Sequence, residues 1–147
     1  MARDLELRLK GETNMELKPW NFGDQQKEGD LSLIRNLTKK VHDANKQWWR
    51  DLETNMPISR NIPEMIALMH SELSEMLEAD RKNLMDDKLP HRRGLEVEAA
   101  DLLIRLLDFC GGLGLDLGGA YVEKMDYNAK RADHKRENRL AQNGKKY

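Results

Sequence analysis

Two pairs of acidic residues are the side chains of this sequence best suited to chemistry. Glu72 and Glu75 are three residues apart, and Glu98 and Asp101 repeat that spacing further along the chain. On an α-helix, residues at i and i+3 lie on one face, so each pair directs two carboxylates the same way. Carboxylate oxygens are the ligands that Mg²⁺ prefers, with further positions left to water and phosphate. The two pairs therefore predict an oxygen-lined site for Mg²⁺, with Mn²⁺ as an alternative.

The segment around Glu72 predicts that a positive charge meets this carboxylate. At 3.6 residues per turn, Glu72 falls inside the apolar arc of its helix, between Leu68 and Met65, and Glu75 lies at the edge. A carboxylate that faces a core costs on the order of several kcal/mol unless a cation or a hydrogen-bond network receives it. We therefore expect a cation beside Glu72.

The second acidic pair belongs to a polar stripe on a helix that is otherwise apolar. The stripe consists of Gly94, Glu98, Asp101, Arg105 and Asp108. Taken alone, it is better explained as the solvated face of a helix that is otherwise buried. The pair on a facing helix favours metal binding, because four converging carboxylates repel one another without a divalent cation. No histidine follows any of these acids by three residues, so the Glu-x-x-His pattern of di-iron bundles is absent from the sequence.

Helical periodicity and turn residues predict four helices that position these acids. We expect an irregular N-terminal extension over residues 1–29, one helical domain over residues 30–140 and a frayed tail over residues 141–147. The expected helices run from Asp30 or Leu31 to about Asp51, from the cap Asn61 to about Lys82, from Leu95 to Cys110 before Gly111 and Gly112, and from the cap Asp116 to about Asn138. Short connections favour an all-α antiparallel bundle.

Composition narrows the classes of protein to which the chain can belong. A charged fraction of 35% and a hydrophobic fraction of 39% suit amphipathic helices whose core is completed by a second subunit. A net charge of −1 gives no general attraction to nucleic acid. The sequence has no long apolar run and no signal-peptide core, so no membrane span is expected. The single cysteine, Cys110, excludes an internal disulfide and fits a reducing cytoplasm.

The ordered set of motifs resembles the MazG-like branch of the all-α nucleoside triphosphate pyrophosphatases. The matching elements are Glu72-Leu-Ser-Glu75, then Glu98-Ala-Ala-Asp101, then a helix with the run Lys124, Asn128 and Arg131. A lone ExxE is common in helices, but three elements in order on separate helices are considerably more specific. The resemblance covers residues 31–135.

The resemblance implies a fold, a reaction and an assembly. Glu72, Glu75, Glu98 and Asp101 would bind one or two Mg²⁺ ions, and Glu72 or Glu75 would activate water. The substrate would be a nucleoside triphosphate, cleaved between the α- and β-phosphates to a monophosphate and pyrophosphate. The protein would be a homodimer or homotetramer of the all-α pyrophosphatase fold. Base and sugar preference are not fixed by the motifs.

Two further groups are candidates for substrate contacts. Lys124, Asn128 and Arg131 lie close to one stripe and would hold phosphates, although a solvated basic face explains them without a ligand. Trp48, Trp49 and Asn45 are weaker candidates for the base. Adjacent helical residues point about a quarter turn apart, so at most one tryptophan would face the site, and packing is an equally good explanation for either.

Two other classes of protein remain open at this point. A non-catalytic helical oligomerisation or regulatory module would carry the same acidic stripes as solvated faces. A nucleic-acid binder would use the basic run over residues 130–138, although Asp133 and Glu137 interrupt it.

Overall fold

Helices make up most of the structure. The computed structural model describes residues 23–132 and 138 of the 147-residue chain. The elements, in chain order, are α2 (Asp24–Asn45), the 3-10 turn η1 (Lys46–Trp49), α3 (Ile62–Lys82), α4 (Gly94–Gly112) and α5 (Leu117–Lys130). The described residues form no strand, only isolated bridges between Arg50 and Pro57 and between Met85 and Arg93. The predicted all-α class is confirmed.

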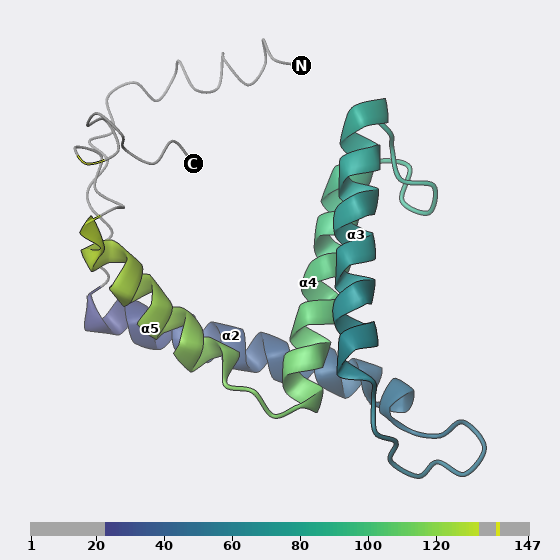
Figure 1. The fold of residues 1–147 in the computed structure, drawn as a ribbon, viewed down its shortest axis with the longest axis horizontal. Coiled ribbons are helices and arrows are strands. Elements are labelled where there is room, and N and C mark those ends of the chain that lie inside the picture. The colour runs from purple at the N-terminus through teal and green to yellow at the C-terminus, as the bar shows by residue number, and fades with distance from the viewer. Residues whose placement is uncertain (1–22, 133–137, 139–147) are drawn as a thin grey trace.

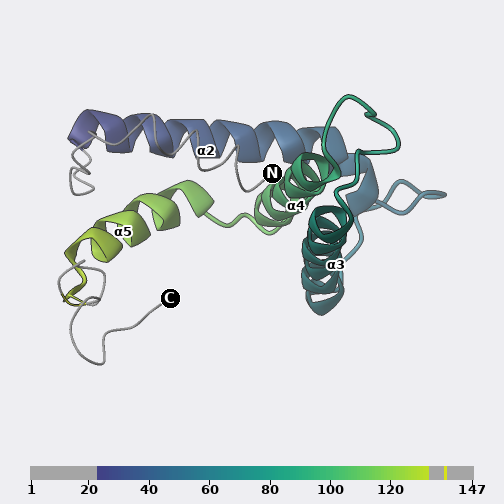
Figure 2. The same ribbon diagram turned by 90° about the horizontal axis from the view of Figure 1, so that it is seen from above.

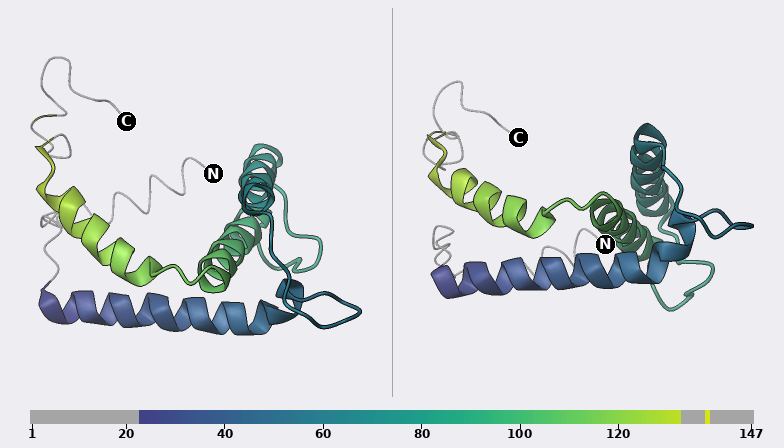
Figure 3. Two further views of the ribbon diagram at one scale, coloured as in Figure 1. Left: turned by 60° about the horizontal axis from the view of Figure 1, so that its bottom comes forward. Right: turned by 90° about the horizontal axis from the view of Figure 1, so that it is seen from below.

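The helices are laid out along α2 (Figures 1 and 2). Helices α3 and α4 pair side by side and cross the C-terminal end of α2, while α5 lies along its N-terminal part (Figure 3). A salt bridge from Arg35 to Asp116, at 2.6 Å, fixes the start of α5 on α2. Gly118 lets the two helices approach closely, since a Cβ there would lie 3.0 Å from the carbonyl oxygen of Leu31. Within the described residues, α5 therefore packs on α2 and does not close one four-helix core with α3.

Two helix starts lie where the sequence predicts them. The side chain of Asn61 accepts a hydrogen bond from the Glu64 amide at 3.2 Å, and Pro63 occupies the first turn of α3. Asp116 accepts from the Gly119 amide at 3.1 Å and caps α5. Such caps satisfy amide groups that have no partner within the helix.

Other helix ends differ from the prediction. Helix α2 begins at Asp24, six residues before Asp30, so residues 24–29 of the expected irregular extension are helical. A bond from Lys27 to Asp126 of α5, at 2.7 Å, ties this first part down. Helix α4 continues through Gly111 and Gly112, where we expected it to stop, and α5 ends at Lys130. The remainder of the expected extension, residues 1–22, and the expected tail over residues 141–147 lie outside the described residues.

The core of this single chain is small. Among the described residues, the buried apolar side chains are those of Met65, Ala79, Leu107 and Cys110. Burial raises the pKa of the Cys110 thiol, which disfavours its reactive thiolate form. Many large apolar side chains stay exposed, including Leu73 and Leu77 on α3 and Leu103 on α4. No described helix is long and apolar enough to cross a membrane.

Candidate metal centre and adjoining pocket

The pairing of α3 with α4 brings acidic side chains of both predicted pairs together. Glu72, Glu98 and Asp101 each offer a carboxylate oxygen, and these oxygens lie within 4.8 Å of one another. Glu72 is buried, Glu98 is half-buried and Asp101 is exposed. Glu75 lines the same pocket but is not one of these three. The structure thus gathers three of the four predicted ligands around one point.

The oxygen donors fit a small hard cation. Mg²⁺ binds oxygen at about 2.0–2.1 Å, so opposite ligands of one ion lie about 4.2 Å apart. The three carboxylate oxygens lie within 4.8 Å of one another, which is near the spacing at which they could share one such ion. The described residues around this point offer only oxygen to a cation, which favours Mg²⁺ or Mn²⁺ over zinc.

The acidic side chains around Glu98 place several negative charges close together. Burial raises the pKa of Glu98, and the nearby charges of Glu75, Glu72 and Asp101 raise it further. Both effects disfavour the ionised form. A divalent cation bound at this point would reverse the second effect.

A guanidinium group meets Glu72, as the burial of that carboxylate predicts. Arg105 Nε donates to Glu72 Oε1 at 2.6 Å, and the Glu72 side chain is only 6% exposed. Arg105 belongs to the polar stripe of α4 that the sequence could also explain as a solvated face. Four residues of the stripe, Glu98, Asp101, Arg105 and Asp108, line one or both of two pockets beside α3 and α4, while Asp101 and Arg105 remain exposed. The expectation of a cation beside Glu72 is confirmed.

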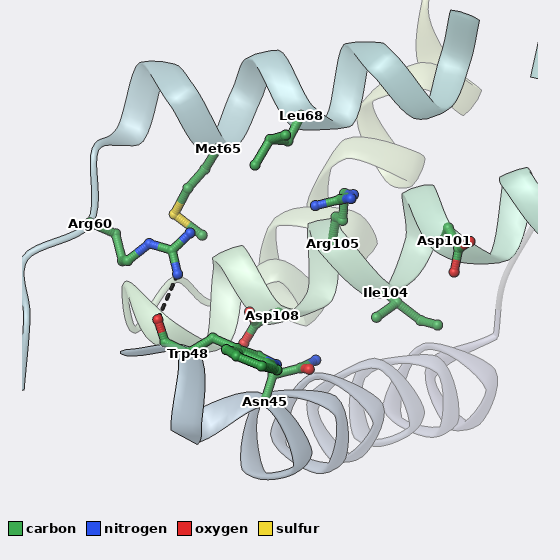
Figure 4. Close-up of a pocket in the computed structure, with 9 residues that line it drawn as sticks. All are labelled: Asn45, Trp48, Arg60, Met65, Leu68, Asp101, Ile104, Arg105 and Asp108. Atoms are coloured by element: carbon green, nitrogen blue, oxygen red, sulfur yellow. Dashed lines mark hydrogen bonds between the residues drawn. The ribbon is translucent and has the colours of Figure 1, made fainter. Parts of the chain in front are cut away.

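The two pockets adjoin each other. The first, which we call the acidic pocket, has a volume of about 400 Å³ and includes the four acids and the loop from Asp86 to Leu89. The second, the Trp48 pocket, has a volume of about 490 Å³ (Figure 4). Its lining residues are Asn45, Trp48, Arg60, Met65, Leu68, Asp101, Ile104, Arg105 and Asp108. Asp101 and Arg105 line both, so the acids stand at the edge of a mixed apolar and polar cavity of a size usual for small ligands.

The two adjacent tryptophans take different roles. Trp48 is half-exposed and, with Asn45, lines the Trp48 pocket. Trp49 Nε1 donates to both oxygens of Asp108, at 3.0 and 3.1 Å, and its ring packs edge-on against His42. Asp108 also accepts from His42 Nδ1 at 2.9 Å. Trp49 therefore locks η1 against α4, and Trp48 is the ring that faces the cavity.

Sequence reasoning missed Arg60 as a residue of the cavity. Its Nη1 donates to the Trp48 carbonyl at 2.6 Å, and its guanidinium lies 5.8 Å from the centre of the Trp49 ring. Arg60 stands in a connection without periodicity, just before the cap of α3, and no motif marks it. Arg105 carried a weak signal, because it follows Asp101 by one turn on the same stripe.

The three predicted phosphate-binding residues lie elsewhere. Lys124 Nζ stands 4.9 Å from the centre of the Tyr127 ring, and the Arg131 guanidinium stands 5.8 Å from it. Asn128 has a buried side-chain oxygen without a hydrogen-bond partner among the described residues. Helix α5 packs on α2, apart from the acid-bearing half of α4 (Figures 1 and 3). Within one chain, the structure does not bring Lys124, Asn128 or Arg131 to the acids.

Comparison with protein-family models, with curated proteins and with solved structures finds no match for this chain. The resemblance to MazG-like pyrophosphatases therefore rests on the residue pattern alone.

Proposed function

We propose that this protein is an Mg²⁺-dependent pyrophosphohydrolase that cleaves nucleoside triphosphates to the monophosphate and pyrophosphate. The observation that carries the proposal is the convergence of Glu72, Glu98 and Asp101 around one point at the edge of the Trp48 pocket. A cation site beside a cavity with an exposed aromatic ring suits a ligand that has both a polyphosphate and a base. The motif resemblance supports the same reaction.

Each group of residues has a distinct role in the proposed reaction. Glu72, Glu98 and Asp101 hold the cation, which neutralises charge on the phosphoryl oxygens and polarises water. Glu75 is exposed, lines the acidic pocket and stands outside the three ligands, so it is the carboxylate that accepts the proton of the attacking water. The base lies against Trp48, with Asn45 and Arg60 as its polar neighbours.

The distance between α5 and the acids supports a site shared between subunits. If Lys124, Asn128 and Arg131 bind phosphates, they do so in a second copy of the chain, because their own helix packs on α2. The side-chain oxygen of Asn128, which has no hydrogen-bond partner among the described residues, is in keeping with such a contact.

An apolar stripe on α3 supports the same assembly. Ile62, Ile66, Leu73 and Leu77 share one face of α3 and are between 42% and 59% exposed. Exposed apolar area of this kind marks an interface with another protein surface. We propose a homodimer or homotetramer that buries this stripe. Leu77→Lys is expected to shift the sedimentation of the protein toward the monomer, and an unchanged assembly would place the interface elsewhere.

The proposed partners are nucleotides and copies of the chain, in a cytoplasmic setting. The described residues offer no membrane-spanning helix, and the net charge of −1 gives no basis for proposing nucleic acid as a partner. Part of the basic run over residues 130–138 lies outside the described residues.

Product analysis with a panel of ribo- and deoxynucleoside triphosphates tests the reaction. We expect a monophosphate and pyrophosphate in the presence of Mg²⁺ and no turnover with a chelator. Glu72→Gln is expected to abolish turnover, while Glu64→Gln, an exposed position in the first turn of the same helix, retains it. Release of orthophosphate would contradict cleavage between the α- and β-phosphates.

The same variants separate the enzyme from a non-catalytic helical module. The enzyme is expected to gain thermal stability with Mg²⁺ and a non-hydrolysable triphosphate together, and to lose that gain in Glu72→Gln. A module with solvated acids would show neither a metal-dependent shift nor turnover of any nucleotide.

A further inference from the structure

Arg105 occupies a place that the proposed function does not explain. It extends from α4 into the space facing α3, at the junction of the two pockets (Figure 4). Its Nε is bonded to Glu72, the most deeply buried carboxylate of the candidate metal centre. The Arg105 side chain itself stays 42% exposed, so the guanidinium has room to move toward solvent and toward either pocket.

The bond to Glu72 and the binding of a metal compete for the same carboxylate. Without a metal, the guanidinium is the cation that compensates the buried charge of Glu72. A divalent ion held by Glu72, Glu98 and Asp101 would lie close to this positive group and would bind the same carboxylate group. Like charges at such short range repel each other strongly where water is partly excluded. The ion therefore enters at the expense of the contact between Arg105 and Glu72.

A triphosphate offers the displaced guanidinium a new partner. Arg105 lines the acidic pocket and the Trp48 pocket together, which is where the phosphate nearest the sugar would lie if the base occupies one pocket and the metal the other. Guanidinium groups bind phosphate oxygens in a fork geometry. In the described part of the chain, no carboxylate other than Glu72 lies within ion-pair distance of Arg105.

We infer that Arg105 is a resident counter-ion that competes with the divalent cation for Glu72 and turns to the triphosphate when metal and nucleotide bind together. This inference rests on the proposed function. Its consequence is that the site binds metal weakly alone and binds it well only with the nucleotide, so Arg105 couples the two ligands. Arg105 thus weakens metal binding in the absence of nucleotide and is also a contact for the substrate.

The test measures metal and nucleotide binding separately in the full chain. Arg105→Gln keeps a hydrogen-bond donor for Glu72 but removes the charge. We expect it to bind Mn²⁺ alone on the order of tenfold more tightly than the wild type, as judged from the strength of a charged hydrogen bond. It should bind a triphosphate with a methylene bridge between the α- and β-phosphates on the order of tenfold more weakly. Calorimetry gives both affinities without turnover.

Two further variants make the outcome specific. Arg92→Gln removes an exposed arginine near the start of α4 that pairs with Glu96 and lines neither pocket, so both affinities should stay unchanged. Arg105→Lys keeps the charge without the fork and protects the fold, and its metal affinity should fall between those of the wild type and Arg105→Gln.

Each result decides between the proposals. Equal or weaker Mn²⁺ binding by the Arg105 variants would overturn the competition, and unchanged nucleotide binding would overturn the move to the phosphates. A wild-type protein that binds no Mn²⁺ even with the nucleotide would overturn the proposed function itself. The wild-type measurement alone reveals that failure, so the two are distinguishable.

Discussion

Substitution of Gly112 by alanine tests the contact that holds the end of α2 on α4. A Cβ at this position would lie 2.1, 2.3 and 2.5 Å from three carbon atoms of the Trp49 ring. These separations are far inside van der Waals contact, so either the ring or the helix must move. The ring is not free to rotate away, because Trp49 Nε1 is bonded to both oxygens of Asp108.

The expected cost follows from these contacts. Overpacking of a well-packed site costs about 1–3 kcal/mol, and loss of a hydrogen bond to a charged acceptor costs about 1.5–3 kcal/mol. Alanine regains about 1 kcal/mol over glycine as a helix former. We therefore expect Gly112→Ala to lower the free energy of unfolding by about 1.5–5 kcal/mol. This is a large share of the stability of a small domain, which is about 5–15 kcal/mol.

Urea unfolding followed by far-UV circular dichroism measures the change in the free energy of unfolding. Both proteins are compared at one fixed concentration, because the stability of an assembling protein would depend on concentration. Gly29→Ala is the matched control. Gly29 lies within α2, and a Cβ there would meet nothing within 4 Å. This control should gain about 0.4–1 kcal/mol from the restricted unfolded chain. The reasoning is refuted if Gly112→Ala is as stable as the wild type or gains stability like the control.

Two further predictions concern the assembly and the response to pH. If Lys124 acts in a second subunit, inactive Glu72→Gln and Lys124→Ala proteins, dissociated and reassembled in equal amounts, should recover about a quarter of wild-type turnover. Random pairing of the two variants leaves that share of two-chain sites intact. No recovery would place Lys124 and Glu72 in the site of one chain. The bond from Arg35, together with the Gly119 amide, lowers the pKa of Asp116 to about 2. A lowered carboxyl pKa stabilises the fold above the ordinary pKa near 3.8, and the contribution disappears as pH falls through about 2. Asp116→Asn keeps the cap but should melt at a lower temperature than the wild type at pH 7. The difference in melting temperature should vanish near pH 2. A difference that persists at pH 2 would show that the charge of Asp116 is not its cause.

The parts of the site that come from one helix could be predicted from the sequence. The i, i+3 spacing puts Glu98 and Asp101 on one face, and the apolar neighbours of Glu72 show that it points inward. The burial of Glu72 and its need for a cation follow from that periodicity, and both are observed. The caps Asn61 and Asp116 were equally local, because each forms its bond within the first helical turn.

Contacts between helices could not be read in the same way. Gly111 and Gly112 look like a helix end in sequence, since glycine commonly terminates helices. In the structure they continue α4 because His42 and Trp49 fill the space that side chains would need. The sequence alone does not distinguish a glycine that allows close approach of two helices from a glycine that ends a helix, because the difference lies in the neighbouring helix.

The placement of α5 is a second contact between helices that the sequence did not predict, and it affects which residues can share the site. Its Lys124, Asn128 and Arg131 belong to the motif that includes the acids, and an antiparallel bundle would bring them together in one chain. The few residues between α4 and α5 permit either arrangement. The contacts that place α5 on α2 include the close approach at Gly118 and the bonds of Lys27 and Arg35 to Asp126 and Asp116, which lie far along the sequence. Since α5 packs on α2 in the described part of the chain, a site that used both groups would draw on a second chain, and the motif by itself does not reveal this.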